Sequence, residues 1–200
     1  MNRDKPLSVG VLAVQGAFEE HAAMLGRLGA DPFLLRKRAD ADRKMDALVL
    51  PGGESTVQGK LLRELDMLEP LRQKISAGLP VMGTCAGMIL LAKTLENDAA
   101  VYFGLMDITV RRNAYGRQLG SFTAKERFAD QGETVMPFIR APYIAAAGPG
   151  TEILAEVNGK AVAARQKNML ALSFHPEVTQ ETTVHRYFLN MAYSAGQDWG

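Results

Sequence analysis

The chain has 200 residues, of which 47% are hydrophobic and 22% charged, and its formal net charge is +1. This length predicts one domain over residues 1–200, and the balanced charge argues against nucleic acid or an anionic membrane as a partner. A single cysteine excludes an internal disulfide, and three scattered histidines lack the spacing of a zinc site. We expect a cytoplasmic protein, because the N-terminal residues do not resemble a signal peptide and no apolar run reaches the length of a membrane span.

Short apolar runs alternate with helical patterns in the first half of the chain. The predicted strands cover residues 7–14, 32–35, 47–50 and 79–82, and the predicted helices cover 16–28 and 55–68. Gly29 suits the end of the first helix and Ser55 the N-cap of the second. This alternation predicts an α/β fold with a mostly parallel central sheet flanked by helices.

The second half has a different pattern. Short strands are predicted near residues 108–110, 153–157, 161–165 and 169–173, followed by an amphipathic helix over about 181–193. Strands this closely spaced favour antiparallel additions to one edge of the sheet.

Cys85 lies between Gly83 and Gly87, where a predicted strand turns into a helix. Such a sharp turn exposes a nucleophile to substrate, and the start of a helix favours the thiolate form of cysteine. Free cysteines are also often buried structural residues, so this segment alone is compatible with both interpretations.

His175 and Glu177 follow the last predicted strand. Pro176 disfavours a helical conformation at His175, so we expect an extended segment in which the two side chains point the same way. A carboxylate bonded to one imidazole nitrogen leaves the other free to exchange a proton with Cys85.

The turn over residues 51–55 carries two adjacent glycines whose amides can approach a ligand closely. With Ala86, Gly53 would then form an oxyanion hole beside Cys85. A phosphate site is the alternative, although the full P-loop pattern is missing. Arginines in segments 111–118 and 138–142 match an α-carboxylate, and Gln15 should lie at the same sheet edge.

The motifs around Cys85 and His175 resemble the triad of class I glutamine amidotransferases, which have a flavodoxin-like sheet. Segments 13–21, 51–56, 112–118 and 138–142 extend the likeness to the glutaminase subunits of pyridoxal 5′-phosphate synthases. The resemblance therefore covers residues 13–177.

The resemblance implies Cys85 as nucleophile, His175 as general base and acid, and Glu177 as its orienting carboxylate. It implies that L-glutamine binds at Gly53, Glu54, Ser55, Arg112, Ile139 and Arg140. It also implies no cofactor and transfer of ammonia to a separate synthase subunit in a large hetero-oligomeric complex. We further predict that Gln15 links docking of that partner to activation.

Three alternatives stay open. Another class I glutaminase would feed an imidazole, purine or pyrimidine synthase, and a non-catalytic relative would bind glutamine or a partner as a regulator. A cysteine redox sensor would also use an exposed thiol, but the chain has no second cysteine to resolve a sulfenic acid.

Overall fold

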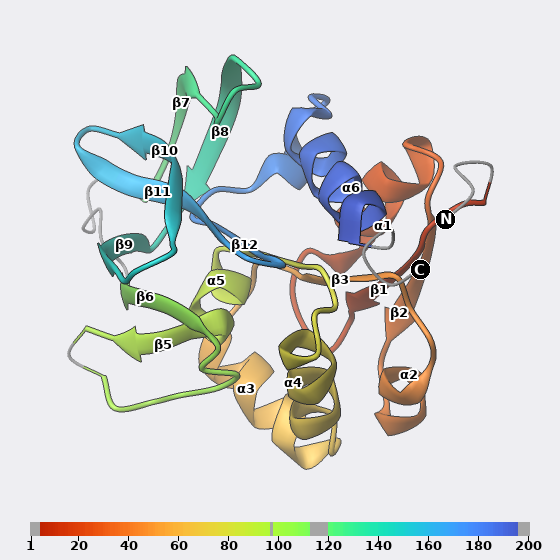
Figure 1. Cartoon of the computed structure of the whole chain (residues 1–200). Coiled ribbons are helices and arrows are strands. Elements are labelled where there is room, and N and C mark those ends of the chain that lie inside the picture. The colour runs from red at the N-terminus through yellow and green to blue at the C-terminus, as the bar shows by residue number, and fades with distance from the viewer. Residues whose placement is uncertain (1–4, 97, 113–119, 196–200) are drawn as a thin grey trace.

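The computed structural model describes residues 5–96, 98–112 and 120–195 of the chain. Its main sheet has the strand order β2-β1-β3-β4-β12-β11-β9-β6-β5, and β10 pairs with β11 outside this path (Figure 1). The strands of this sheet are β1 (Ser8–Leu12), β2 (Asp31–Leu35), β3 (Ala47–Leu50), β4 (Val81–Thr84), β5 (Ala92–Leu95), β6 (Met106–Arg111), β9 (Tyr143–Ala147), β10 (Glu152–Val157), β11 (Lys160–Gln166) and β12 (Met169–Leu172). A separate antiparallel hairpin contains β7 (Ser121–Arg127) and β8 (Glu133–Ile139).

The sheet has a parallel half and an antiparallel extension. Strands β2, β1, β3, β4 and β12 pair in parallel. Beyond β12, β11 pairs antiparallel with β12, β9 with β11 and β6 with β9, whereas the last strand, β5, pairs in parallel with β6. Both features confirm the predicted fold class.

Helices cover both faces of the parallel half (Figure 1). Helices α1 (Phe18–Arg27) and α6 (Thr183–Ala195) lie on one face, and α2 (Arg38–Asp42), α3 (Ser55–Glu64), α4 (Leu68–Ser76) and α5 (Ala86–Leu91) lie on the other. Strand β3 shows why its sequence is apolar throughout. Ala47 and Val49 pack toward α1 and α6, whereas Leu48 and Leu50 pack toward the opposite helices, so all four side chains are buried.

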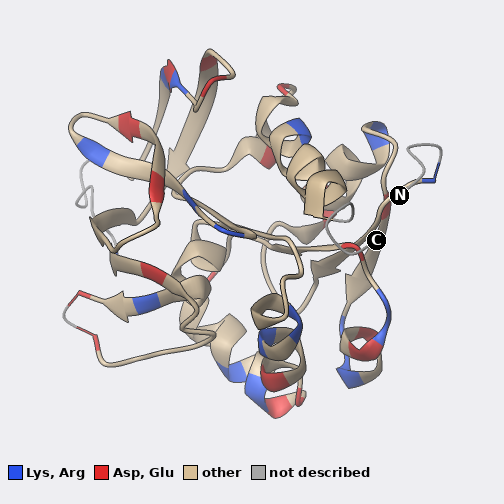
Figure 2. Ribbon diagram, viewed as in Figure 1, with Lys and Arg blue, Asp and Glu red and all other residues tan. Residues whose placement is uncertain are grey.

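The outer helices carry charges of both signs. Figure 2 shows Lys and Arg beside Asp and Glu on α2, α3 and α4, as expected for solvent-facing helices. None of the helices among the described residues combines the length and the apolar character needed to cross a membrane.

The predicted helix over residues 55–68 is wrong in one respect, because the structure has two helices there. Helix α3 ends at Glu64 and α4 begins at Leu68. Between them, Asp66 adopts a φ of 52°, which interrupts helical hydrogen bonding. The predicted N-cap is also wrong. Glu54 has the extended backbone of a cap and Ser55 is already helical.

Several elements were not predicted, namely α2, α4, β5, β7, β8 and β9. Helix α2 and strand β5 are too short for a periodic pattern to identify them. Strand β7 is mostly exposed and mixes charged with apolar side chains, so its extended form depends on pairing with β8. Residues 113–118 of the predicted arginine-rich segment lie outside the described residues.

Candidate active site

Cys85 lies on a sharp turn between β4 and α5, as its flanking glycines predict. Its backbone has a φ of 48° and a ψ of −99°, which is unusual for a residue with a side chain and costs about 1–3 kcal/mol. The Cys85 amide donates to the Leu172 carbonyl at 2.7 Å. A Cβ on Gly87 would lie 2.0 Å from the Leu50 carbonyl oxygen, so close packing of strand and helix requires glycine there.

His175 and Glu177 form a buried pair beside this turn. His175 Nδ1 lies 2.7 Å from Glu177 Oε1, which leaves Nε2 for the thiol. The predicted contact is confirmed, but the expected extended segment is wrong from Pro176 onward. Residues Pro176–Val178 form a 3₁₀ turn, and this turn brings the Glu177 carboxylate back to the imidazole.

The surroundings of His175 favour its protonated form. Burial opposes the positive charge, but the neighbouring Cys85 and Glu177 side chains together raise the pKa of His175 to about 10. His175 therefore carries a proton at neutral pH. A protonated imidazole beside Cys85 can give its proton to a leaving group during a reaction at the sulfur.

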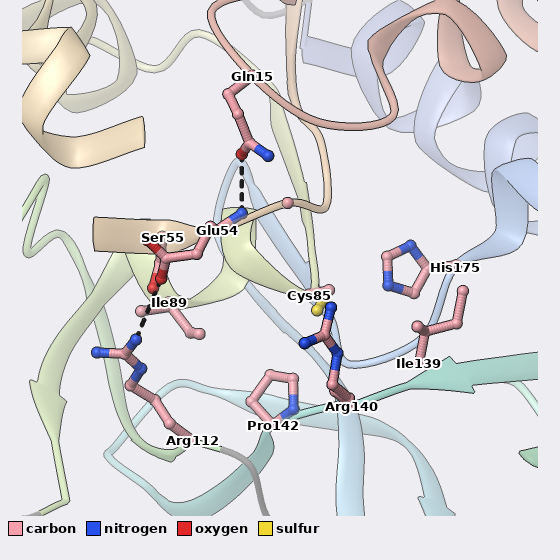
Figure 3. Close-up of a pocket in the computed structure, with 11 residues that line it drawn as sticks. Gln15, Glu54, Ser55, Cys85, Ile89, Arg112, Ile139, Arg140, Pro142 and His175 are labelled. Carbon is pink, nitrogen blue, oxygen red and sulfur yellow. Dashed lines mark hydrogen bonds and ion pairs between the residues drawn. The ribbon is translucent and has the colours of Figure 1, made fainter. Parts of the chain in front are cut away.

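Cys85 and His175 open onto a cavity of about 380 Å³, called the pocket below (Figure 3). Its remaining lining residues are Gln15, Gly53, Glu54, Ser55, Ile89, Arg112, Ile139, Arg140 and Pro142. Every residue predicted to contact glutamine therefore lies in one place. Glu177 is buried behind His175, and Ala86 is buried as the first residue of α5.

The loop after β3 is held against the loop after β1. Gln15 Oε1 accepts a hydrogen bond from the Glu54 amide at 2.8 Å (Figure 3). Gln58 on α3 donates to the carbonyls of Gln15 and Pro51 at 2.9 and 3.2 Å. A Cβ on Gly52 would lie 2.3 Å from His175 Cε1, so this loop also supports the imidazole.

Glu54 has two roles at the start of α3. Its carboxylate caps the helix by accepting from the amides of Thr56 and Val57. It also lies 3.4 Å from Arg112 Nη2 (Figure 3). Burial opposes its charge, but the two amides and Arg112 lower the pKa of Glu54 overall. Arg112 is in turn held by Asp98 at 3.0 Å.

The end of the hairpin β7–β8 forms the wall of the pocket opposite the loops that follow β1 and β3. Ile139 is the last residue of β8, and its side chain is 41% exposed. Arg140 follows with a φ of 45°, and its amide donates to the Gly120 carbonyl at 2.6 Å. Strained backbone of this kind is common at functional sites, where the surrounding structure maintains it.

Several residues that shape the site were not predicted from the sequence. Gln58 supports the glycine loop, Asp98 fixes Arg112, and Ile89 and Pro142 line the pocket. No local pattern marks them. His21 lies within a motif used for the resemblance, but its position beside Glu177 was not expected.

The model of the SNO glutamine amidotransferase family matches residues 11–194 of the chain. The pyridoxal 5′-phosphate synthase subunit PdxT of Desulfitobacterium hafniense is 58% identical over 92% of each chain. The protein of the same name in Bifidobacterium longum is 54% identical over 91% of this chain and 99% of its own.

Solved structures give the same result for the fold. A crystal structure described as a glutamine amidotransferase superposes with a TM-score of 0.88 at 42% identity, covering 92% of this chain and 98% of that one. PurLQS from Thermotoga maritima superposes with a TM-score of 0.65 at 14% identity, covering 98% and 99%. At that identity the likeness concerns the fold alone.

Proposed function

The chain belongs to the SNO glutamine amidotransferase family, and we propose that its pocket hydrolyses L-glutamine to L-glutamate and supplies the ammonia for synthesis of pyridoxal 5′-phosphate. The observation that carries this proposal is the convergence of Cys85, His175 and the six predicted glutamine contacts on one cavity, with Glu177 bonded behind His175.

Charges in the pocket match the ends of a free amino acid. The guanidinium groups of Arg112 and Arg140 suit the α-carboxylate, and the carboxylate of Glu54 suits the α-ammonium group. With these groups engaged, the side-chain carboxamide extends toward Cys85. Fixing a substrate at both ends supplies much of the rate enhancement of such a reaction.

The reaction proceeds through a thioester. The Cys85 thiolate adds to the carboxamide carbon, and the resulting oxyanion is stabilised by the amides of Gly53 and Ala86. The C–N bond then breaks as the His175 imidazolium gives its proton to the departing ammonia. Water next attacks the thioester, His175 takes its proton, and glutamate leaves as the sulfur is released.

A separate synthase subunit is the proposed acceptor of the ammonia. The relatives are named as subunits of pyridoxal 5′-phosphate synthase, which supports a partner that carries out the remaining chemistry. We propose that the two kinds of subunit form a large hetero-oligomeric complex.

Gln15 is the proposed link between docking and activation. Its side chain accepts from the Glu54 amide, and its carbonyl accepts from Gln58. A movement of Gln15 on docking would therefore shift the glycine loop that carries the oxyanion donor. Gln15→Ala should reduce activation by the synthase, and unchanged complex formation together with unchanged stimulation would contradict this role.

Glutamate release from glutamine tests the function, measured with and without the synthase subunit. We expect activity that the synthase stimulates and that Cys85→Ala abolishes. Activity indifferent to the synthase would retain the glutaminase and reject this acceptor. Absence of activity under both conditions would overturn the proposed reaction.

A further inference from the structure

A second pair of histidines lies behind the proposed triad, on the side away from the pocket. His21 on α1 and His185 on α6 are both fully buried, and their helices cover the same face of the sheet (Figure 1). His21 Nε2 lies 3.4 Å from Glu177 Oε2, the carboxylate oxygen that does not contact His175. That oxygen accepts no hydrogen bond among the described residues, so its approach to His21 is an electrostatic contact.

Two further contacts fix the position of the His21 imidazole. Its Nε2 lies 3.1 Å from Thr84 Oγ1, one residue before Cys85. Its Nδ1 lies 3.0 Å from His185 Nε2. His185 Nδ1 is buried and has no hydrogen-bond partner in the described part of the chain.

These contacts select one tautomer. If His21 carries its proton on Nε2, an N–H faces Thr84 and the Glu177 carboxylate, and Nδ1 accepts from His185. The bare nitrogen of His185 is then the atom without a partner. In the opposite tautomer His21 carries its proton on Nδ1 and donates it to His185. The lone pair of His21 Nε2 then faces the carboxylate, and His185 buries an unpaired N–H at Nδ1. An unpaired buried donor is the costlier arrangement.

We propose that His21 is a positioning residue for the glutaminase reaction. Its imidazole presents an N–H to the second oxygen of Glu177, and the contact with His185 selects the tautomer that carries this N–H. This role rests on the proposed function, because it acts through Glu177 and His175. An ionised and oriented Glu177 keeps His175 protonated beside Cys85.

The charges around the pair agree with a neutral His21. Burial lowers the pKa of His21, and the neighbouring His175 lowers it further. The negative charges of Glu177 and Glu20 raise it, but the overall shift is downward. Burial likewise lowers the pKa of His185 to about 3, with His21 and Arg27 adding to the effect and Glu177 opposing it. A neutral imidazole holds one N–H, which is what the assigned tautomer needs.

Variants of His21 separate positioning from packing. His21→Leu removes the donor, His21→Asn places its amide near the Nδ1 side that faces His185, and His21→Gln returns an N–H near Nε2. Met24→Leu is the matched control, since Met24 is buried one turn along α1.

Two readouts are needed. One is kcat and KM for glutamine hydrolysis in the presence of the synthase. The other is the rate of Cys85 alkylation by iodoacetamide against pH, which requires no turnover. We expect His21→Leu and His21→Asn to lower kcat roughly tenfold with little change in KM, and to move the acidic limb of the alkylation profile up by about one pH unit. His21→Gln should recover most of both effects, and Met24→Leu should show neither.

Equal kcat values and equal alkylation profiles for the Asn and Gln variants would overturn the proposal, even if the Leu variant does not fold. If the unaltered protein alkylates normally but releases no glutamate with the synthase present, the proposed function fails. In that case the shift in the alkylation profile still decides whether His21 positions Glu177.

Discussion

The parallel half of the sheet and the antiparallel extension with its hairpin meet at the pocket, and they differ in burial. Strands β3, β4 and β12 are buried along their whole length, and the loops after them carry Cys85, His175 and Glu177. The other region supplies Arg112, Ile139 and Arg140, which line the pocket and are partly or largely exposed. The proposed reacting groups thus follow fully buried strands. The proposed glutamine contacts are divided between the loop after β3 in the same region and the more accessible segments of the other region.

We expect damage around Cys85 and His175 in the parallel half to lower kcat, whereas damage to the glutamine contacts of the antiparallel half should raise KM. The largest effect should come from His175→Gln, which keeps the size of the side chain but removes the proton carrier. We expect glutamate release to fall by at least about 10³-fold. The melting temperature should change little, and a variant that retains a tenth of the activity would remove His175 from the chemistry.

Gly52→Ala should have the next largest effect. The added Cβ would lie 2.3 Å from His175 Cε1, so the imidazole must move away from its position beside Cys85. Such a displacement should lower kcat roughly 10²-fold. Gly26→Ala on α1 is the matched control, because its Cβ would meet no atom within 4 Å. Equal kinetics for the two alanine variants would show that His175 does not depend on this loop.

Arg112→Met tests the other region. Loss of the guanidinium removes a partner for the α-carboxylate, so KM for glutamine should rise about tenfold with kcat nearly unchanged. Arg111→Met is the control, since Arg111 pairs with Glu96 and Tyr143 and does not line the pocket. A loss in kcat without a change in KM would mean that Arg112 acts in the chemical step. The predicted division of kcat and KM effects between the two regions would then be wrong.

The smallest effect concerns stability at low pH. All three histidines of the chain lie in the parallel half or on its helices. The pKa of His185 falls from its usual 6.5 to about 3 in the folded protein. The unfolded chain therefore binds a proton below pH 6.5 that the native state does not, and the free energy of unfolding decreases as pH falls.

His185→Leu removes this site. Between pH 6.5 and 5.5 the free energy of unfolding should decrease in both proteins. The decrease should be about 1 kcal/mol smaller for the variant than for the unaltered protein. The pKa of His175 is raised to about 10 in the folded protein. Protonation of His175 therefore stabilises the fold, and this contribution is complete below pH 6.5 and is lost as pH rises toward 10. It is present in both proteins. Urea unfolding at the two pH values measures the difference, and identical slopes would mean that His185 is protonated in the native state.

Local patterns predicted most of the parallel half. The buried strand over residues 47–50, the turn around Cys85 and the order of strands and helices all follow from apolar runs and glycine positions that lie close together in the chain. The helix cap at Glu54 was missed because Ser is a preferred N-cap residue and Glu is not, so only the backbone conformation identifies Glu54 as the cap.

Tertiary structure alone determined which distant residues meet. His21 and His185 are separated by 164 positions, and their contact depends on how α1 and α6 pack on one face of the sheet. The hairpin β7–β8 likewise forms because its strands pair with each other and bury Phe138 against Phe174. The sequence by itself predicted Cys85 as the nucleophile and His175 and Glu177 as its partners, since strand ends and turns are local. The network behind Glu177 and the far wall of the pocket arise from packing between segments, for which a local pattern carries no signal.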